Sequence, residues 1–167
     1  MIVSNASPLI TFAKVGKIDL VLRLYDEIFV SDAVKQEVID NGKKEGYADA
    51  LLLEDYLRNN KIKVIKPGKP LCVKGLHRGE AGTIALALEL GVTEVLIDEN
   101  DARVIAKVYG LNPRGTLFIL IESVRKKIIS EDEAVETLDE MLNNEFRISS
   151  RIYSLFLDKI KNERQRI

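Results

Sequence analysis

The chain has 167 residues, of which 46% are apolar and 31% charged, and these are the proportions of a single globular domain. Its net charge of −1 excludes a uniformly cationic nucleic-acid binder but leaves room for a local basic patch. No apolar run approaches the roughly 20 residues that a membrane span needs. The single cysteine, Cys72, cannot form an internal disulfide, which fits a reducing compartment. We therefore expect a cytoplasmic protein without a membrane segment.

Short apolar runs alternate with amphipathic segments along the chain. Buried strands are predicted at residues 1–4, 28–30 and 95–97, a half-exposed edge strand at 61–65, and a brief strand or turn at 111–113. Helices are predicted at about residues 7–16, 20–24, 31–39, 48–58, 80–90, 115–125, 130–142 and 149–160, with one more beginning directly after Asp98. This alternation predicts an α/β fold in which three or four parallel strands are flanked by helices. We expect one domain over residues 1–160 and a charged tail over 161–167.

Local signals mark several helix ends and loops. Ser7 followed by Pro8 suits a helix start, Ser31 suits another, and Gly91 suits a helix end. Residues 130–133, Ser-Glu-Asp-Glu, form the pattern of a capping box. The composition of residues 41–46 and 67–79 predicts loops.

Polar side chains gather at one predicted edge of the sheet. Asn5 and Asp98 each end a hydrophobic strand, Glu80 opens a helix, Asp101 lies in the first turn of the next helix, and Glu37 lies in an early helix. Crowded carboxylates raise one another's pKa unless a cation neutralises them. Ligands that are all oxygen indicate Mg²⁺ or Mn²⁺ rather than zinc. Such an ion could support hydrolysis of a phosphate ester.

Each of these residues also has a purely structural interpretation. Asp98 could cap the following helix with Asp101 at its third position, and Glu80 could simply favour a helix N-terminus. Asn5 could cap its own turn, and Glu37 could be an ordinary charged residue on a surface helix. Only the combination of these residues favours a functional site.

The sequence lacks the motifs of nucleotide-binding proteins and of serine hydrolases. The chain has no glycine-rich dinucleotide fingerprint, no phosphate loop and no nucleophile elbow. His77 is the only histidine, and its position beside Arg78 is typical of a loop residue.

The segment between Asp55 and Glu80 contains no acidic residue. Seven basic residues fall there: Arg58, Lys61, Lys63, Lys66, Lys69, Lys74 and Arg78. A run of basic residues that leads to a metal–carboxylate centre suits a phosphodiester substrate. A solvated strand and loop would give the same composition, so both interpretations stay open.

Four short motifs carry a family resemblance. They are residues 2–10 (IVSNASPLI), 78–81 (RGEA), 96–99 (LIDE) followed by Ala102 and Arg103, and the pair Gly115 and Thr116. In this order and spacing they resemble the PIN (PilT N-terminus) superfamily, and most closely a branch of small prokaryotic PIN-like proteins related to toxin–antitoxin ribonucleases. The resemblance covers roughly residues 1–127.

The resemblance implies a three-layer α/β/α fold and a metal-dependent ribonuclease of the kind found as toxins in toxin–antitoxin pairs. It implies that Asn5, Glu80, Asp98 and Asp101 hold Mg²⁺ or Mn²⁺ and that Glu37, Glu80, Asp98 and Asp101 take part in catalysis. Lys66, Lys69, Lys74 and Arg78 would then bind RNA. An antitoxin protein and a second copy of the chain are the implied partners. The departure is Asn5, where the family pattern has an aspartate, and it keeps open a second function: a catalytically weak PIN-like module that binds RNA or a partner protein.

Overall fold

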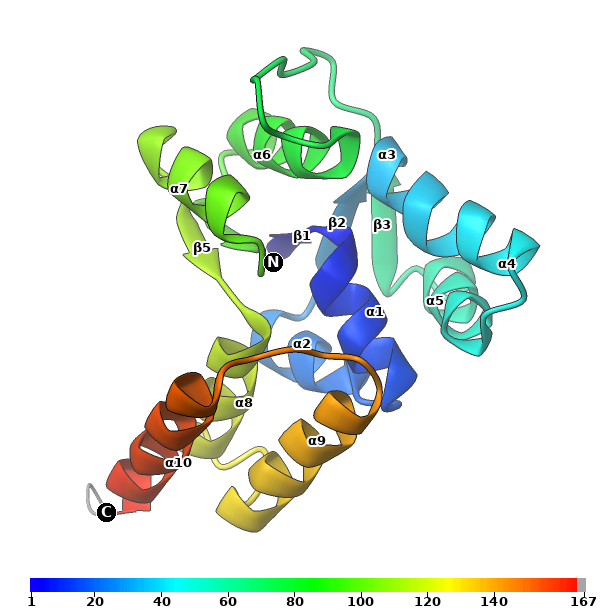
Figure 1. The fold of residues 1–167 in the computed structure, drawn as a ribbon. Coiled ribbons are helices and arrows are strands. Elements are labelled where there is room, and N and C mark those ends of the chain that lie inside the picture. The colour runs from blue at the N-terminus through cyan, green and yellow to red at the C-terminus, as the bar shows by residue number, and fades with distance from the viewer. Residues whose placement is uncertain (165–167) are drawn as a thin grey trace.

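Five parallel strands form the central layer of the computed structural model, which describes residues 1–164 (Figure 1). The strands are β1 (Ile2–Ser4), β2 (Ile28–Ser31), β3 (Ile62–Ile65), β4 (Glu94–Leu96) and β5 (Asn112–Arg114), in the spatial order β3-β2-β1-β4-β5. All neighbouring pairs are parallel, and Val3 of the central strand lies opposite Phe29 on one side and Val95 on the other.

The expectation of three or four strands was too low by at least one, because the segment after residue 110 is strand β5 rather than a turn. Pro113 obscures this strand in the sequence, since proline cannot donate a ladder hydrogen bond. An edge strand tolerates it, and β5 is bound to its neighbour through Asn112 N to Thr93 O (2.7 Å) and Ile97 N to Arg114 O (2.8 Å).

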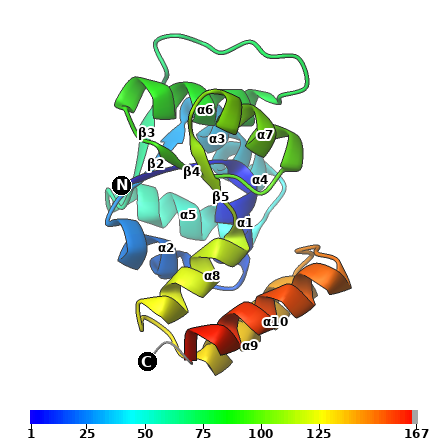
Figure 2. The ribbon, with the colours of Figure 1, turned by 90° about the vertical axis from the view of Figure 1, so that its left-hand side faces the viewer.

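Helices cover both faces of the sheet, as Figures 1 and 2 show. They are α1 (Ala6–Lys14), α2 (Ile18–Tyr25), α3 (Asp32–Lys35), the π-helix η1 (Gln36–Asn41), α4 (Gly42–Lys44), α5 (Ala48–Arg58), α6 (Arg78–Leu90), α7 (Asn100–Val108), α8 (Thr116–Arg125), α9 (Glu131–Asn143) and α10 (Ser150–Arg164). The chain therefore has the predicted α/β architecture with three layers.

Each face of the sheet has its own hydrophobic core, because successive side chains of a strand point to opposite sides. Ile2 packs into the larger core, which contains side chains of α1, α2, α5, α8, α9 and α10. Val3 packs into the smaller core with side chains of α6 and α7. In Figure 2, α6 and α7 lie above the sheet and most of the other helices lie below it.

Several predicted helix ends are confirmed. Ser31 Oγ accepts a hydrogen bond from Val34 N (3.2 Å), and Gly91 ends α6 in the left-handed conformation. Ser130 and Glu133 form the predicted capping box, with reciprocal hydrogen bonds of 3.1 and 2.8 Å.

Two predicted segments differ from the structure. Residues 41–44 are helical, because α3 continues through η1 into α4 instead of ending in a loop at residue 41. The last helix runs to Arg164, so residues 161–164 of the predicted tail are helical, and residues 165–167 lie outside the described part of the chain. Within that described part, no helix combines the length and the apolarity that crossing a bilayer requires.

Candidate functional site

Four helices begin close to the carboxyl ends of the central strands, where open α/β sheets bind their ligands. Asn5, directly after β1, is the N-cap residue of α1, and Glu99, shortly after β4, is the N-cap residue of α7. Glu80 lies in the first turn of α6, and Glu37 lies at the start of η1, which continues from α3. The chain thus brings polar residues from four distant segments to one edge of the sheet (Figure 1).

Asn5 is the most deeply buried of these side chains, with 4% of its surface exposed. Its Nδ2 donates a hydrogen bond to Glu99 Oε2 over 3.2 Å. Its Oδ1 is one of two buried side-chain polar atoms in the described residues that have no hydrogen-bond partner. Buried polar atoms are nearly always paired, so this oxygen calls for a ligand or a structural explanation.

Gly79 of α6 shows where this unpaired oxygen is directed. A Cβ atom at this position would lie 3.3 Å from Asn5 Oδ1 and 2.9 Å from Glu37 Oε2. The two oxygens therefore converge on the same small region beside the helix. Any residue larger than glycine would fill that region.

The surroundings of Glu37 disfavour the charged form of its carboxyl group. Glu37 as a residue is exposed, but partial burial of its carboxyl group raises the pKa above the ordinary value, and the negative charges of Glu99 and Glu80 raise it further, with His77 opposing the shift. In the described residues no lysine or arginine lies within ion-pair distance of these three carboxylates. A bound cation would relieve this repulsion.

The backbone that carries Glu37 is unusual. Residues 36–41 form a π-helix, a conformation that is rare and that occurs frequently at functional sites. It favours the functional interpretation of Glu37 over that of an ordinary surface residue. No sequence pattern we considered indicates a π-helix.

Glu80 stabilises the N-terminus of α6, as the structural interpretation of its position expected. Its side chain is buried, and its Oε2 accepts a hydrogen bond from His77 N over 2.8 Å, which satisfies a free N–H group before α6. Its charge also contributes to the raised pKa of Glu37. The residue can thus fix the helix start and add negative potential to the site at once.

Asp98 faces the start of α8. Its Oδ1 accepts from Thr116 N (2.8 Å) and its Oδ2 accepts from Thr116 Oγ1 (2.7 Å). It therefore caps α8, whereas the structural interpretation of the sequence had expected it to cap α7. Neither Asp98 nor the exposed Asp101 is among the charges that shift the pKa of Glu37. Their roles in ion binding and catalysis stay predictions, and an Asp98 that held an ion could keep both contacts with Thr116, because each carboxylate oxygen accepts more than one partner.

Glu99 is the residue that sequence reasoning missed. It accepts hydrogen bonds from Asn5 Nδ2 and from Ser7 Oγ, so both of its oxygens are held. Ser7 is not the cap of α1, because Asn5 is the N-cap residue and the helix begins at Ala6, two residues before the predicted start at Pro8. The available signal was the position of Glu99 beside Asp98 in a pair of acids that follows a strand.

The donor set fits a divalent ion that keeps part of its water shell. Among the described residues, no group of three or more His, Cys, Asp or Glu side chains is close enough to hold an ion unaided. Mg²⁺, however, is usually bound through one or two carboxylates, several waters and substrate phosphates. The unpaired Asn5 Oδ1 beside the Glu37 carboxylate, with Glu99 behind it, supplies such an incomplete set.

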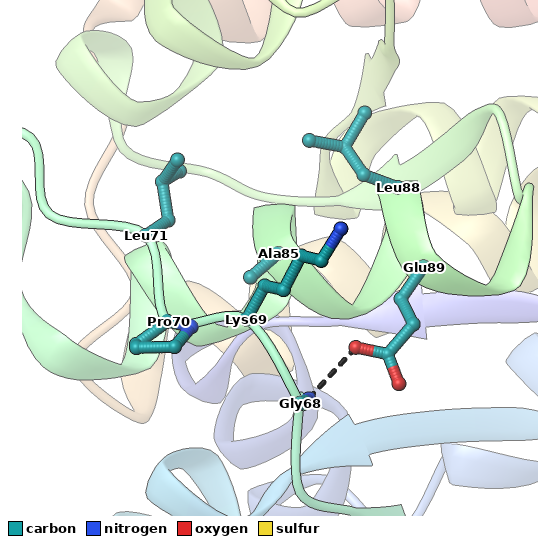
Figure 3. Close-up of a pocket in the computed structure, with 7 residues that line it drawn as sticks. All are labelled: Gly68, Lys69, Pro70, Leu71, Ala85, Leu88 and Glu89. Carbon is teal, nitrogen blue, oxygen red and sulfur yellow. Dashed lines mark hydrogen bonds between the residues drawn. The ribbon is translucent and has the colours of Figure 1, made fainter.

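Three of the four predicted RNA-binding residues lie on the loop that crosses the outer face of α6, and the fourth, Arg78, begins that helix. Lys66 and Arg78 line a hollow of about 210 Å³ together with Asp32, and Lys69 lines a neighbouring open hollow of about 710 Å³. Figure 3 shows the second hollow, in which the loop faces α6 and Gly68 N donates to Glu89 Oε2 over 2.8 Å. Lys74 lines neither hollow but is exposed on the same loop. Arg78, the first residue of α6, connects this surface to the carboxylate site.

Comparison with known proteins agrees with the fold. A family model named DUF3368 and described as a PIN domain matches residues 1–162. The chain therefore belongs to the PIN domain family, and the resemblance seen in its motifs is confirmed. Membership suggests a nuclease-type or toxin–antitoxin module, and PIN domains generally use divalent metal ions. No curated protein and no solved structure matches the chain significantly.

Proposed function

We propose that this protein is a ribonuclease that hydrolyses RNA phosphodiester bonds with the help of Mg²⁺ or Mn²⁺. The observation that carries the proposal is the buried, unpaired Asn5 Oδ1, which faces the Glu37 carboxylate across Gly79, in a cluster that no lysine or arginine of the described residues pairs with. This arrangement is costly for the protein alone and becomes favourable when a cation is present.

Asn5 and Glu37 are the residues that would hold the ion, with Glu99 behind Asn5 and Glu80 in the first turn of α6 adding negative potential. A divalent cation in this place would supply positive charge against the negative charge that develops on a phosphate during hydrolysis. Glu37 is placed to accept the proton of the attacking water, because its Oε2 faces the same small region beside Gly79 as Asn5 Oδ1. Glu80 holds the start of α6 through His77 N, and with it the position of Gly79.

The basic loop supports RNA as the substrate. Lys66, Lys69, Lys74 and Arg78 are exposed and could contact backbone phosphates without reading sequence. The charge pattern, with basic side chains on the approach and acidic ones in the site, suits a polyanion whose scissile phosphate must come close to carboxylates.

A second candidate is a PIN-like module that binds RNA or a partner protein without cleaving. Asn5 favours it, because an amide contributes no charge to ion binding. The surface of α7 also favours a protein partner, since Val104 and Val108, one turn apart, are 62% and 81% exposed. An antitoxin protein or a second copy of the chain would be the expected partner, and the chain would then be the toxin of a toxin–antitoxin pair.

The test is cleavage of a mixed-sequence single-stranded RNA by the purified protein with EDTA, Mg²⁺ or Mn²⁺. We expect cleavage that depends on the ion, and a loss of about 10²- to 10⁴-fold in Glu37→Gln, the range typical for removing a general base. Glu136→Gln, which removes a carboxylate on α9 far from the site, should cleave as the wild type does. Cleavage that is absent, or equal in EDTA, would reject the nuclease, and retained RNA binding would then support the binding module.

A further inference from the structure

Asn5 and Glu99 are joined in a way that fixes the direction of the amide group. The Asn5 Nδ2 atom donates to Glu99 Oε2 over 3.2 Å, and a carboxylate can only accept at that contact. The Oδ1 atom must therefore point away from Glu99. It points toward Gly79 and the Glu37 carboxylate, where it has no hydrogen-bond partner among the described residues.

Glu99 is itself held in place. Its other oxygen, Oε1, accepts a hydrogen bond from Ser7 Oγ in the first turn of α1. The positive end of the α1 dipole lies at this turn and favours a negative charge there. Glu99 is thus a fixed carboxylate, and the Asn5 amide is aligned against it.

This geometry explains why position 5 is occupied by an amide. An aspartate there would have no hydrogen to donate, and two carboxylates would face each other at the distance of the present hydrogen bond. An asparagine lets Glu99 keep its charge close to the site while one oxygen stays directed at the ion. Glu99, on the connection after β4, can therefore carry the negative charge that an aspartate at position 5 would otherwise bring to the site.

We propose that Asn5 and Glu99 act as one amide–carboxylate unit, in which Glu99 is a positioning residue that directs Asn5 Oδ1 into the ion site and supplies the charge that position 5 lacks. The ion-binding part of this inference rests on the proposed function. The pairing of the two side chains does not, and it can be tested in the protein without metal.

The experiment exchanges the two groups: Asn5→Asp, Glu99→Gln, and the double variant Asn5→Asp/Glu99→Gln are compared with the wild type. In EDTA, Asn5→Asp should lower the melting temperature by at least about 2 °C, because it places two carboxylates in contact. The double variant should recover this loss, since the glutamine amide can donate to the carboxylate introduced at position 5. Glu136→Gln is the control for removing a charge elsewhere and should leave the melting temperature unchanged.

The second measurement is calorimetric titration with Mn²⁺ alone, without RNA. Glu99→Gln keeps a hydrogen-bond acceptor for Asn5 but loses the charge, and it should bind Mn²⁺ about 10- to 100-fold more weakly. The double variant restores one negative charge at the pair and should bind within a few-fold of the wild type. Glu136→Gln should bind as the wild type does.

The outcomes separate this inference from the proposed function. If Asn5→Asp has the wild-type melting temperature in EDTA, or if the double variant fails to recover it, the pairing is overturned. If Glu99→Gln binds Mn²⁺ as the wild type does, Glu99 has no part in the ion site. If the wild type itself binds no Mn²⁺ while the melting temperatures follow the exchange, the pairing stands and the proposed metal-dependent function fails.

Discussion

Two adjacent acids, Asp98 and Glu99, serve different elements. Asp98 turns to α8 and accepts both hydrogen bonds that Thr116 offers, whereas Glu99 turns to Asn5 and Ser7 at the start of α1. Which acid faces the site depends on how the chain leaves β4 at Leu96 and turns into α7. This division of roles decides which substitution should affect the ion and which should affect stability.

Asp98 should make stability depend on pH in the protein without metal. Its pKa is raised, mainly by burial, although the hydrogen bonds from Thr116 oppose the shift. A carboxyl group with a raised folded-state pKa stabilises the fold fully below its unfolded pKa of about 4, and this contribution is lost as the pH rises through the folded-state pKa. Asparagine cannot ionise but can still accept from Thr116 N. We therefore expect the stability of Asp98→Asn relative to the wild type to increase as the pH rises from about 4 toward neutral.

Denaturant unfolding in EDTA at a series of pH values measures this difference. Glu136→Gln serves as the reference, because its carboxylate lies on α9, away from Asp98, and its stability difference from the wild type should stay flat. A constant difference between Asp98→Asn and the wild type over the same range would contradict the prediction.

At the scale of single residues, the sequence predicts where the candidate site lies more readily than it predicts which acidic residues face that site. Asn5 could be placed at the sheet edge because it follows a short buried strand, and Glu80 could be placed at a helix start by its neighbours. Glu99 could not be chosen over Asp98, because a rotation of one residue after the strand changes which acid faces the site. That rotation is set by tertiary packing against α1 and α8 rather than by local pattern.

Helix α6 is the element on which the site depends most. Gly82, one turn after Gly79, would place a Cβ atom 2.6 Å from Ser31 Oγ at the start of α3. The glycine thus allows α6 to approach α3 closely, and this approach brings Gly79 beside Glu37. The helix was predictable from its apolar stripe, whereas its close contact with α3 was not, because the sequence does not show which element faces a glycine.

The loop before α6 should contribute affinity for RNA without sequence preference. Replacing Lys66, Lys69 and Lys74 by Gln should weaken RNA binding equally for all sequences, since phosphate contacts carry no sequence information. Each lost contact should reduce the slope of log affinity against log salt by about 0.7. Fluorescence anisotropy over a range of salt concentrations measures both quantities.

The matched control replaces three exposed lysines on other elements, Lys44, Lys126 and Lys159. This variant loses the same charge and should keep most of the affinity and a slope close to that of the wild type. Equal effects in the two triple variants would show that only net charge matters. The loop would then be a solvated segment without a specific role in RNA binding.

For the molecule as a whole, binding of the ion to the folded state should raise its stability. A ligand that binds only the native protein stabilises it by about 2.7 kcal/mol at 100 times its dissociation constant. We expect Mn²⁺ or Mg²⁺ to raise the melting temperature accordingly. Gly79→Ala should abolish this gain, because its methyl group would occupy the region between Asn5 Oδ1 and Glu37 Oε2.

The same variant should not be less stable in EDTA. Alanine is favoured over glycine within a helix by up to about 1 kcal/mol, and the end of the Glu37 side chain can move aside. The 3.3 Å contact with Asn5 Oδ1 then requires a shift of only a few tenths of an ångström. Leu88→Ala, in the same helix but away from the site, should keep the ion-induced gain. A full gain in Gly79→Ala would mean that the ion does not lie between these two oxygens.

The order of the strands has a consequence for how the protein is made. β1 emerges first during synthesis and becomes the centre of the sheet, but it pairs with β4, which lies beyond the middle of the chain. Until then β1 is covered by β2 on one side only, and its other edge is open to wrong pairing. The site needs residues from both of these strand ends, since Asn5 directly follows β1 and Glu99 follows β4. A half-made chain therefore cannot assemble the site, and the growing polypeptide stays without it until β4 has docked against β1.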